Sequence, residues 1–331
     1  MHPSRMFQMS RFAAPPVPDK HPVVLLDGGT GRELMRLGAP FRQPEWSALA
    51  LIEAPAYVSE VHRRYIRAGA EVISTNSYAV VPFHIGAERF ERAGSALASL
   101  AGELARAAAD EAPHRVQVAG SLPPACGSYR PDLFNAGVAR PVLRRLVQAL
   151  EPHVDLWLSE TLSSVAEMEL VSEVLAGTRQ PWWVSYTLAD QSPRSPGARL
   201  RSGEPVGSAV THAARRGARA VLFNCCQPEV MGEAIIAAKR ALSAGPVQPE
   251  AVLVGAYANA FGPQTAKASA NAELNDLRVD LGPHEYLSWA RQWLQDGADI
   301  VGGCCGVGPE HIALIRDLLQ QGPPRELARH T

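Results

Sequence analysis

The sequence predicts a single (β/α)8 barrel, and three observations support this fold class. The chain has 331 residues, a length that such barrels often occupy as one domain. Eight short apolar segments alternate with stretches whose apolar residues recur at i, i+3, i+4 and i+7, the spacing of one helix face. Eight strand–helix pairs in alternation indicate a parallel sheet that closes on itself. The third observation is that reactive polar residues end these segments or follow them directly: Asp27, Tyr78, Ser121, Glu160, Cys225, Tyr257, Cys304 and Cys305.

The expected strands are spaced so that a helix fits between successive ones. Residues 1–20 are rich in proline and lack an apolar central segment, so we expect a loose tail and not a signal peptide. The barrel is then expected over residues 21–325. In chain order, the strands are predicted at Val23–Leu26, Glu71–Tyr78, Val116–Ser121, Val154–Glu160, Trp182–Leu188, Ala220–Cys225, Ala251–Asn259 and Asp299–Gly303.

Helices are predicted between the strands from their periodicity. Pro55–Ala68 precedes the second strand, and the last helix is expected to begin at Pro309, because proline is favoured in a first helical turn. Four long irregular stretches follow apolar segments, on the side where such barrels carry their active-site loops. They are Gly38–Ala54, Leu122–Ala139, Ala189–Pro205 and Ala260–Pro283.

Composition limits the kind of ligand. With 32 Lys and Arg against 33 Asp and Glu, the formal net charge is -1, so no overall field favours nucleic acid or an acidic membrane. No apolar run is long enough to span a bilayer. Five cysteines, an odd number with two vicinal pairs, do not suit a secreted disulfide framework. We therefore expect a cytoplasmic protein that acts on small molecules, and an oligomer is possible.

The cysteines predict a metal centre. Cys304 and Cys305 lie between glycines at the end of the last strand, and Cys225 ends the sixth. Successive side chains of a strand face opposite ways, so the vicinal pair can serve one site only if the backbone bends, as glycine permits. Three thiolates with an open fourth position describe a zinc ion that binds an exchangeable ligand. Cys226 is expected to pack outward or remain a spare thiol, and Cys126 to be structural.

A zinc ion with three thiolate ligands favours one type of chemistry. It holds a substrate thiol as thiolate at neutral pH, because coordination removes the thiol proton. Attack of that sulfur on an electrophilic carbon follows. Hydrolysis is disfavoured, since the sequence near these cysteines has no histidine-based ligand set.

Several motifs together resemble the homocysteine S-methyltransferase family, which includes betaine, S-methylmethionine and selenocysteine enzymes and the homocysteine domain of cobalamin-dependent methionine synthase. The resemblance extends from about Val23 to about Leu319. It implies a barrel in which Cys225, Cys304 and Cys305 hold zinc, homocysteine adds the fourth sulfur, and methionine is the product. The motifs are Asp27–Gly31, Trp46–Ser47, Ala68–Glu71, Ser74–Tyr78, Glu160–Thr161, Asn224–Cys225 and Gly302–Gly306.

The resemblance also implies roles for other residues. Glu160 is expected to bind the ammonium group of homocysteine as a charge-assisted partner. Asp27 precedes glycines that let a ligand approach the backbone, although Asp-Gly-Gly is also an ordinary turn sequence. Asn224 is expected either to orient a zinc thiolate or simply to form hydrogen bonds at the end of the strand. The resulting prediction has Glu160 and Asp27 as catalytic residues and Asp27, Gly28, Thr75, Asn76, Glu160, Asn224, Trp46 and Tyr78 as substrate-binding residues.

The small-molecule methyl donors that the resemblance implies carry a cationic centre, a sulfonium in S-methylmethionine and S-adenosylmethionine or a quaternary ammonium in betaine, and aromatic faces bind such cations. Trp46 and Tyr78 match aromatic positions of the family, although each could also fill the core. Thr161 stands where the betaine enzyme would place a further aromatic residue, so S-methylmethionine or S-adenosylmethionine is favoured as donor. Three alternatives stay open: a homocysteine-binding subunit served by betaine or a methylcorrinoid partner, a non-catalytic thiol or zinc redox sensor, and a zinc hydrolase.

Overall fold

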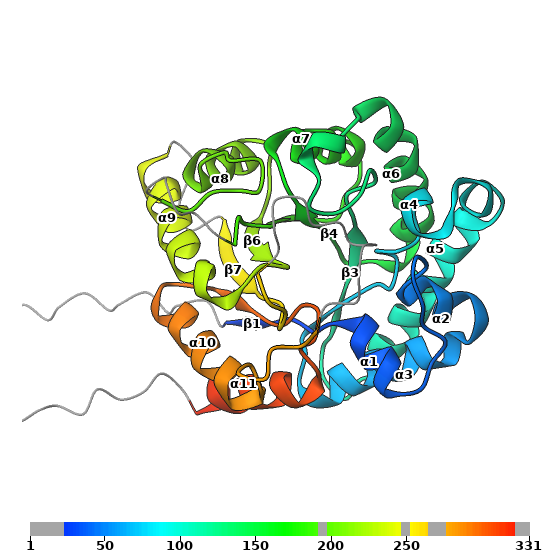
Figure 1. Ribbon diagram of the computed structural model, residues 1–331, viewed down its shortest axis with the longest axis horizontal. Helices are drawn as coiled ribbons and strands as arrows, with labels where there is room; N and C mark the ends of the chain where they lie inside the picture. The colour runs from blue at the N-terminus through cyan, green and yellow to red at the C-terminus, as the bar shows by residue number, and fades with distance from the viewer. Residues whose placement is uncertain (1–22, 191–196, 246–251, 264–275, 322–331) are drawn as a thin grey trace, which may run out of the picture.

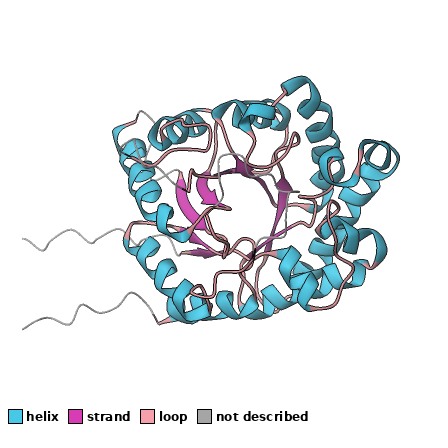
Figure 2. Ribbon diagram, viewed as in Figure 1, coloured by secondary structure: helices cyan, strands magenta, loops and turns pink. Residues whose placement is uncertain are grey.

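The computed structural model describes residues 23–190, 197–245, 252–263 and 276–321, and within them eight parallel strands form one sheet. The strand order is β1-β8-β7-β6-β5-β4-β3-β2, and a parallel bridge between Leu26 and Val72 joins β1 to β2. This bridge closes the ring that Figure 2 shows in magenta, so the predicted barrel is confirmed. The strands are β1 (Val24–Leu25), β2 (Val72–Ser74), β3 (Gln117–Leu122), β4 (Leu156–Leu162), β5 (Trp182–Tyr186), β6 (Ala220–Asn224), β7 (Leu253–Tyr257) and β8 (Ile300–Val301).

Helices form an outer ring around the strands (Figure 1). Each long crossover places a helix on the outside of the sheet, as a parallel barrel requires. Among the described residues, no helix combines the length and apolar character needed to cross a bilayer. The helices are α1 (Thr30–Arg36), α2 (Ser47–Glu53), α3 (Pro55–Ala68), α4 (Pro82–Ile85), α5 (Ala87–Asp110), α6 (Ala136–Leu150), α7 (Val165–Leu175), α8 (Val206–Arg215), α9 (Met231–Ala244), α10 (Pro283–Gln295) and α11 (Pro309–Gln320), with 3-10 turns η1 (Pro131–Leu133), η2 (Glu151–His153) and η3 (Pro228–Val230).

The predicted strands and helices agree with the structure apart from their ends. The second strand is shorter than predicted, because after Ser74 the chain leaves the sheet to line the barrel mouth. The stretch Gly38–Ala54 was predicted to be irregular, and this was wrong for its second half, which forms α2. The tail expected at residues 1–20, and parts of the stretches expected at Ala189–Pro205 and Ala260–Pro283, lie outside the described residues.

Alternation along the strands separates two apolar cores. In β6, Ala220 and Leu222 belong to the core inside the barrel, whereas Val221 and Phe223 belong to the core between sheet and helices. The same alternation points Asn224, the last residue of β6, into the barrel at its carboxyl end. The site described below is thus built on the end of a rigid strand.

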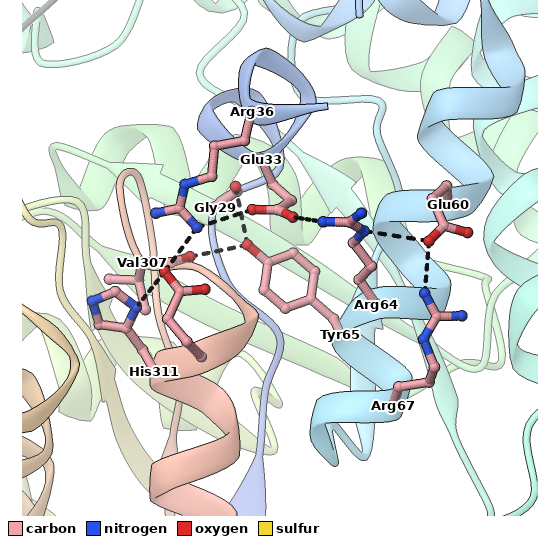
Figure 3. A network of polar contacts seen from close by, with 10 residues as sticks. Gly29, Glu33, Arg36, Glu60, Arg64, Tyr65, Arg67, Val307 and His311 are labelled. Atoms are coloured by element: carbon pink, nitrogen blue, oxygen red, sulfur yellow. Dashed lines mark hydrogen bonds and ion pairs between the residues drawn. The ribbon is translucent and has the colours of Figure 1, made fainter. Parts of the chain in front are cut away.

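A polar network ties α1, α3 and α11 together beside the barrel mouth (Figure 3). Glu33 of α1 is only 2% exposed and accepts hydrogen bonds from Arg36 and from Arg64 of α3. Arg36 also reaches Glu310 of α11 at 2.7 Å. The two guanidinium groups satisfy the hydrogen bonds of this buried carboxyl group, so the network helps to fix how these three helices pack.

Candidate functional site

A pocket lies at the carboxyl ends of the strands and gathers residues from across the whole sequence. Every predicted site residue except Asn224 is in its lining, so the sequence motifs do converge on one place. Polar, aromatic and sulfur-bearing side chains line it. The lining comprises Asp27–Arg32, Phe41, Trp46, Ser47, Ser74–Asn76, Tyr78, Ala79, His84, Ser128, Tyr129, Glu160, Thr161, Cys225, Tyr257, Phe261 and Gly303–Cys305.

Three thiols meet in this pocket. The sulfur atoms of Cys225, Cys304 and Cys305 all lie within 4.8 Å of one another. The Cys304 and Cys225 sulfurs are 3.3 Å apart. Sulfurs around a tetrahedral zinc ion with bonds of about 2.3 Å lie about 3.8 Å apart, so this cluster fits a zinc ion with small adjustments. Cys226 instead lies in the outer core, 4.0 Å from the sulfur of Met231, as predicted for an outward-packed thiol.

The backbone of Cys225 explains how its side chain reaches the pocket although the preceding residue, Asn224, already points into the barrel. Its φ of 55° is in the left-handed region, which turns the chain directly after Asn224 and redirects the cysteine inward. Of the described residues other than glycine, four have a positive φ, and all four line the pocket. They are Trp46, Tyr129, Thr161 and Cys225. Such conformations cost free energy and persist where the surroundings enforce them, often at functional sites.

The loop that carries Cys304 and Cys305 is held between the ends of two other strands. The Gly303 amide donates to the Asp27 carbonyl after β1, and the Cys304 amide donates to the Ala258 carbonyl after β7. A Cβ on Gly303 would lie 2.1 Å from the Val307 side chain, so the loop folds back too tightly for any other residue. The bend predicted for the vicinal thiols is therefore present.

Tyr65 of α3 supports the same loop from behind (Figure 3). Its buried hydroxyl lies 3.1 Å from the Gly29 carbonyl oxygen and 2.9 Å from that of Val307. A Cβ on Gly28 would lie 2.4 Å from the Val307 carbonyl oxygen, and one on Gly29 would lie 2.5 Å from the Cys304 carbonyl oxygen. The two glycines after Asp27 thus admit the cysteine loop at close range, in addition to any ligand approach.

Two carboxyl groups line the same pocket as the three thiols. Asp27 is 5% exposed and accepts hydrogen bonds from the Ser74 amide at 2.7 Å and from the Ser74 hydroxyl at 3.3 Å. Desolvation by burial raises its pKa to about 8. Burial likewise raises the pKa of Glu160 to about 7, although the Ser121 hydroxyl donates to it at 2.5 Å. A cationic ligand bound beside these two carboxyl groups would favour their ionised forms.

Asn224 connects the β4 and β6 ends beneath the thiols. Its carbonyl oxygen accepts from the Thr161 amide at 2.9 Å and the Ser185 hydroxyl at 2.8 Å, and its amide nitrogen donates to the Thr161 hydroxyl at 2.9 Å. That nitrogen also lies 3.9 Å from the Cys304 sulfur. Asn224 thus contacts a thiol while it holds the irregular end of β4 in place.

Thr75 and Asn76 are buried and already bonded to protein. The Thr75 hydroxyl accepts from the Ser121 amide at 3.0 Å, and the Asn76 amide donates to the Ser47 carbonyl at 3.1 Å. Asn76 thereby positions the start of α2, which follows Trp46. These contacts give both residues a structural task at the pocket wall.

Several aromatic side chains form one wall of the pocket. The ring of Trp46 is 6.0 Å from that of Phe41 and 6.3 Å from that of His84, both edge to face. Tyr78 lies 6.5 Å from His84, and its hydroxyl is 2.6 Å from the Ser128 hydroxyl. Both predicted aromatic residues therefore line the pocket, beside the carboxyl groups.

Sequence reasoning missed several residues of this pocket. Phe41 and His84 are in loop or short helical segments whose position no periodicity indicates. No role was predicted for Tyr129. Its hydroxyl donates to the Cys225 sulfur at 2.9 Å, a contact that depends on a folded loop and not on spacing.

The fold and the site together define a class, a (β/α)8 barrel with a cluster of three thiols at its mouth. The family model for homocysteine S-methyltransferase matches residues 24–319. The chain belongs to the homocysteine S-methyltransferase family and is a methyltransferase.

Individual relatives agree with this assignment. The chain is similar to homocysteine S-methyltransferase of Escherichia coli, with 32% identity over 90% of this chain and 96% of the relative. It is also similar to selenocysteine methyltransferase of Astragalus bisulcatus, with 26% identity over 90% and 93%. The solved structure of the metallated form of the Escherichia coli homocysteine methyltransferase MmuM superposes with a TM-score of 0.71 at 29% identity, covering 91% of this chain and 97% of that one.

Proposed function

We propose that this protein transfers a methyl group from a sulfonium donor, S-methylmethionine or S-adenosylmethionine, to the sulfur of homocysteine, giving methionine. The homocysteine sulfur forms the new bond to the methyl carbon, and the donor sulfur leaves as a neutral thioether. The observation that carries the proposal is the cluster of three thiols in one pocket with two carboxyl groups, of which Asp27 is buried and Glu160 is half-buried. A zinc ion held by Cys225, Cys304 and Cys305 would bind the homocysteine sulfur as thiolate.

The carboxyl groups define where the amino acid end of homocysteine binds. Glu160, and Asp27 beside it, would each be ionised by an approaching ammonium group, and the ammonium would receive charge-assisted hydrogen bonds. Ser121 and Tyr257 hold the Glu160 carboxyl in place from two sides. The substrate is thereby oriented with its sulfur toward the thiols.

The aromatic wall supports a cationic donor. Faces of Trp46 and Tyr78 would each contribute about 0.5 to 2 kcal/mol to binding a sulfonium, and this contribution ends when the charge is lost. Thr161 offers no aromatic face, and its hydroxyl is bonded to Asn224. We therefore favour a sulfonium over the quaternary ammonium of betaine. The cytoplasm remains the proposed compartment, because reduced thiols persist there.

The deciding experiment incubates zinc-loaded protein with homocysteine and, in separate reactions, S-methylmethionine, S-adenosylmethionine and betaine carrying a labelled methyl group. We expect labelled methionine with a sulfonium donor and little with betaine. Product only after addition of a methylcorrinoid protein would establish the partner-dependent alternative, and zinc binding with no product from any donor would favour a sensor.

A variant tests the donor wall. Trp46→Ala should raise the donor KM about 2- to 30-fold, the equivalent of one cation–π contact, and leave the homocysteine KM nearly unchanged. Trp289→Ala, on the outer helix α10, is the matched control. An equal rise of the donor KM in both variants would show that Trp46 is not part of the donor site.

A further inference from the structure

Tyr129 makes a contact that the proposed reaction has not used. It lies in the segment between β3 and α6, and its hydroxyl donates a hydrogen bond to the Cys225 sulfur at 2.9 Å. Among the described residues, Cys225 is the one thiol of the three for which a hydrogen bond from a hydroxyl is seen. Both partners have left-handed backbones, with φ of 67° for Tyr129 and 55° for Cys225. Two strained residues that meet in one hydrogen bond indicate a contact that the fold enforces.

A buried ion pair holds the tyrosine ring. The guanidinium carbon of Arg201 lies 4.6 Å from the centre of the Tyr129 ring. Arg201 pairs with Asp190 at 3.1 Å, and their side chains are 5% and 0% exposed. Burying such a pair costs several kcal/mol of desolvation for each charge, so its position requires a reason beyond general stability.

The same ion pair contacts the chain around Cys225 from the other side. The Asp190 carboxylate accepts a hydrogen bond from the Gln227 amide at 2.9 Å, two residues after the cysteine. The Thr187 hydroxyl lies 3.4 Å from the Cys225 carbonyl oxygen and 3.4 Å from the Arg201 side chain. Segments that follow β3, β5 and β6 thus converge on a single thiol.

We propose that Tyr129 is a positioning residue for the metal centre: its hydroxyl fixes the Cys225 sulfur in the ligand position and draws charge from the thiolate, and the Arg201–Asp190 pair holds the ring in place. This inference rests on the proposed zinc site. The contact that Cys304 receives from the Asn224 amide is longer, at 3.9 Å, so Tyr129 makes the three ligands unequal. A thiolate with less charge leaves more positive charge on the ion for the incoming substrate sulfur.

The experiment measures zinc affinity by competition with a chromophoric chelator, without reference to turnover. Tyr129→Phe removes the hydroxyl and keeps the ring over Arg201. We expect about 10- to 100-fold weaker zinc binding, the usual result of losing such a partner of a ligand. Arg201→Lys keeps a charge beside Asp190 and loses the flat guanidinium, so it should weaken binding in the same direction by a smaller factor.

Tyr186→Phe is the matched control. Tyr186 is buried in β5 and faces the outer core, and its hydroxyl has no hydrogen-bond partner among the described residues. This variant should bind zinc as the wild type does. Equal weakening in Tyr186→Phe and Tyr129→Phe would overturn the proposal, because a buried hydroxyl anywhere would then suffice.

A spectroscopic readout separates positioning from general stability. In cobalt(II)-substituted protein, Tyr129→Phe should move the thiolate-to-metal charge-transfer band to longer wavelength, because a thiolate without its hydrogen bond gives up an electron more easily. An unchanged band together with wild-type zinc affinity would refute the inference and leave the proposed function intact. Wild-type protein that bound no zinc would instead refute the proposed function.

Discussion

Replacing Glu160 with glutamine should stabilise the metal-free protein and weaken its binding of homocysteine. Burial raises the Glu160 pKa from its ordinary 4.5 to about 7, so the folded protein holds a proton that the unfolded chain releases. A raised pKa contributes stability below pH 4.5, and this contribution is lost as the pH rises to about 7. At about 1.36 kcal/mol per pH unit, wild-type protein above pH 7 is less stable by about 3 kcal/mol than it would be with a neutral group here.

Glutamine keeps the shape and the hydrogen bonds of the neutral acid. Its carbonyl oxygen can accept from the Ser121 hydroxyl, and its amide can donate to the Tyr257 oxygen. Glu160→Gln should therefore match wild type near pH 4.5 and exceed it by about 3 kcal/mol in unfolding free energy at pH 8.

The assay is urea unfolding of metal-free protein at several pH values, followed by circular dichroism. Glu103→Gln, an exposed glutamate in the middle of α5, serves as the control and should show no comparable gain at pH 8. A Glu160→Gln protein that is less stable than wild type at pH 8 would refute the reasoning, because the carboxylate would then be well solvated or paired in the apo state.

Three further outcomes are expected. Cys304→Ser should abolish zinc retention measured by metal analysis after dialysis, whereas Cys226→Ser should retain zinc, and the reverse pattern would reassign the ligands. The homocysteine KM should fall as the pH rises through about 7, since ionised Glu160 binds the ammonium; an equal pH dependence in Glu160→Gln would exclude this role. Tyr65→Phe should lower the unfolding free energy by about 1 to 2 kcal/mol in denaturant titration, because its hydroxyl bonds two buried carbonyls of the site loops; no loss would show that other donors satisfy them.

The barrel and the thiol cluster could be predicted because both depend on patterns that are visible in the sequence itself. Apolar periodicity marks strands and helices, and a barrel brings the ends of its parallel strands to one mouth. That geometry alone places Cys225 beside Cys304 and Cys305 across about 80 residues of chain. The same reasoning left two possibilities for Cys226, an outward-packed residue or a spare thiol, and the structure shows the first.

The contacts around the thiols could not be predicted in this way. Tyr129 reaches Cys225 through a loop whose path depends on left-handed residues, and no periodicity encodes such conformations outside glycine. Gly28 was expected to make room for a ligand, and the structure shows that it also makes room for the carbonyl of Val307. Both contacts depend on packing between segments that are far apart in the sequence, and this packing is known only from the folded barrel.

The site concentrates unfavourable features that the rest of the barrel must offset. Asp27 and Glu160 are held where the charged form is disfavoured, and the backbone of Cys225 is strained. In the proposed function, a bound cation would favour the ionised carboxyl groups and a bound metal would hold the thiols as thiolates. The network around Glu33 and the hydroxyl of Tyr65 stabilise the metal-free barrel independently of any ligand. Ligand binding should therefore stabilise the mouth far more than the opposite end of the barrel, so amide hydrogen exchange on adding zinc and homocysteine should slow mainly in the loops that follow β1, β4, β6 and β8.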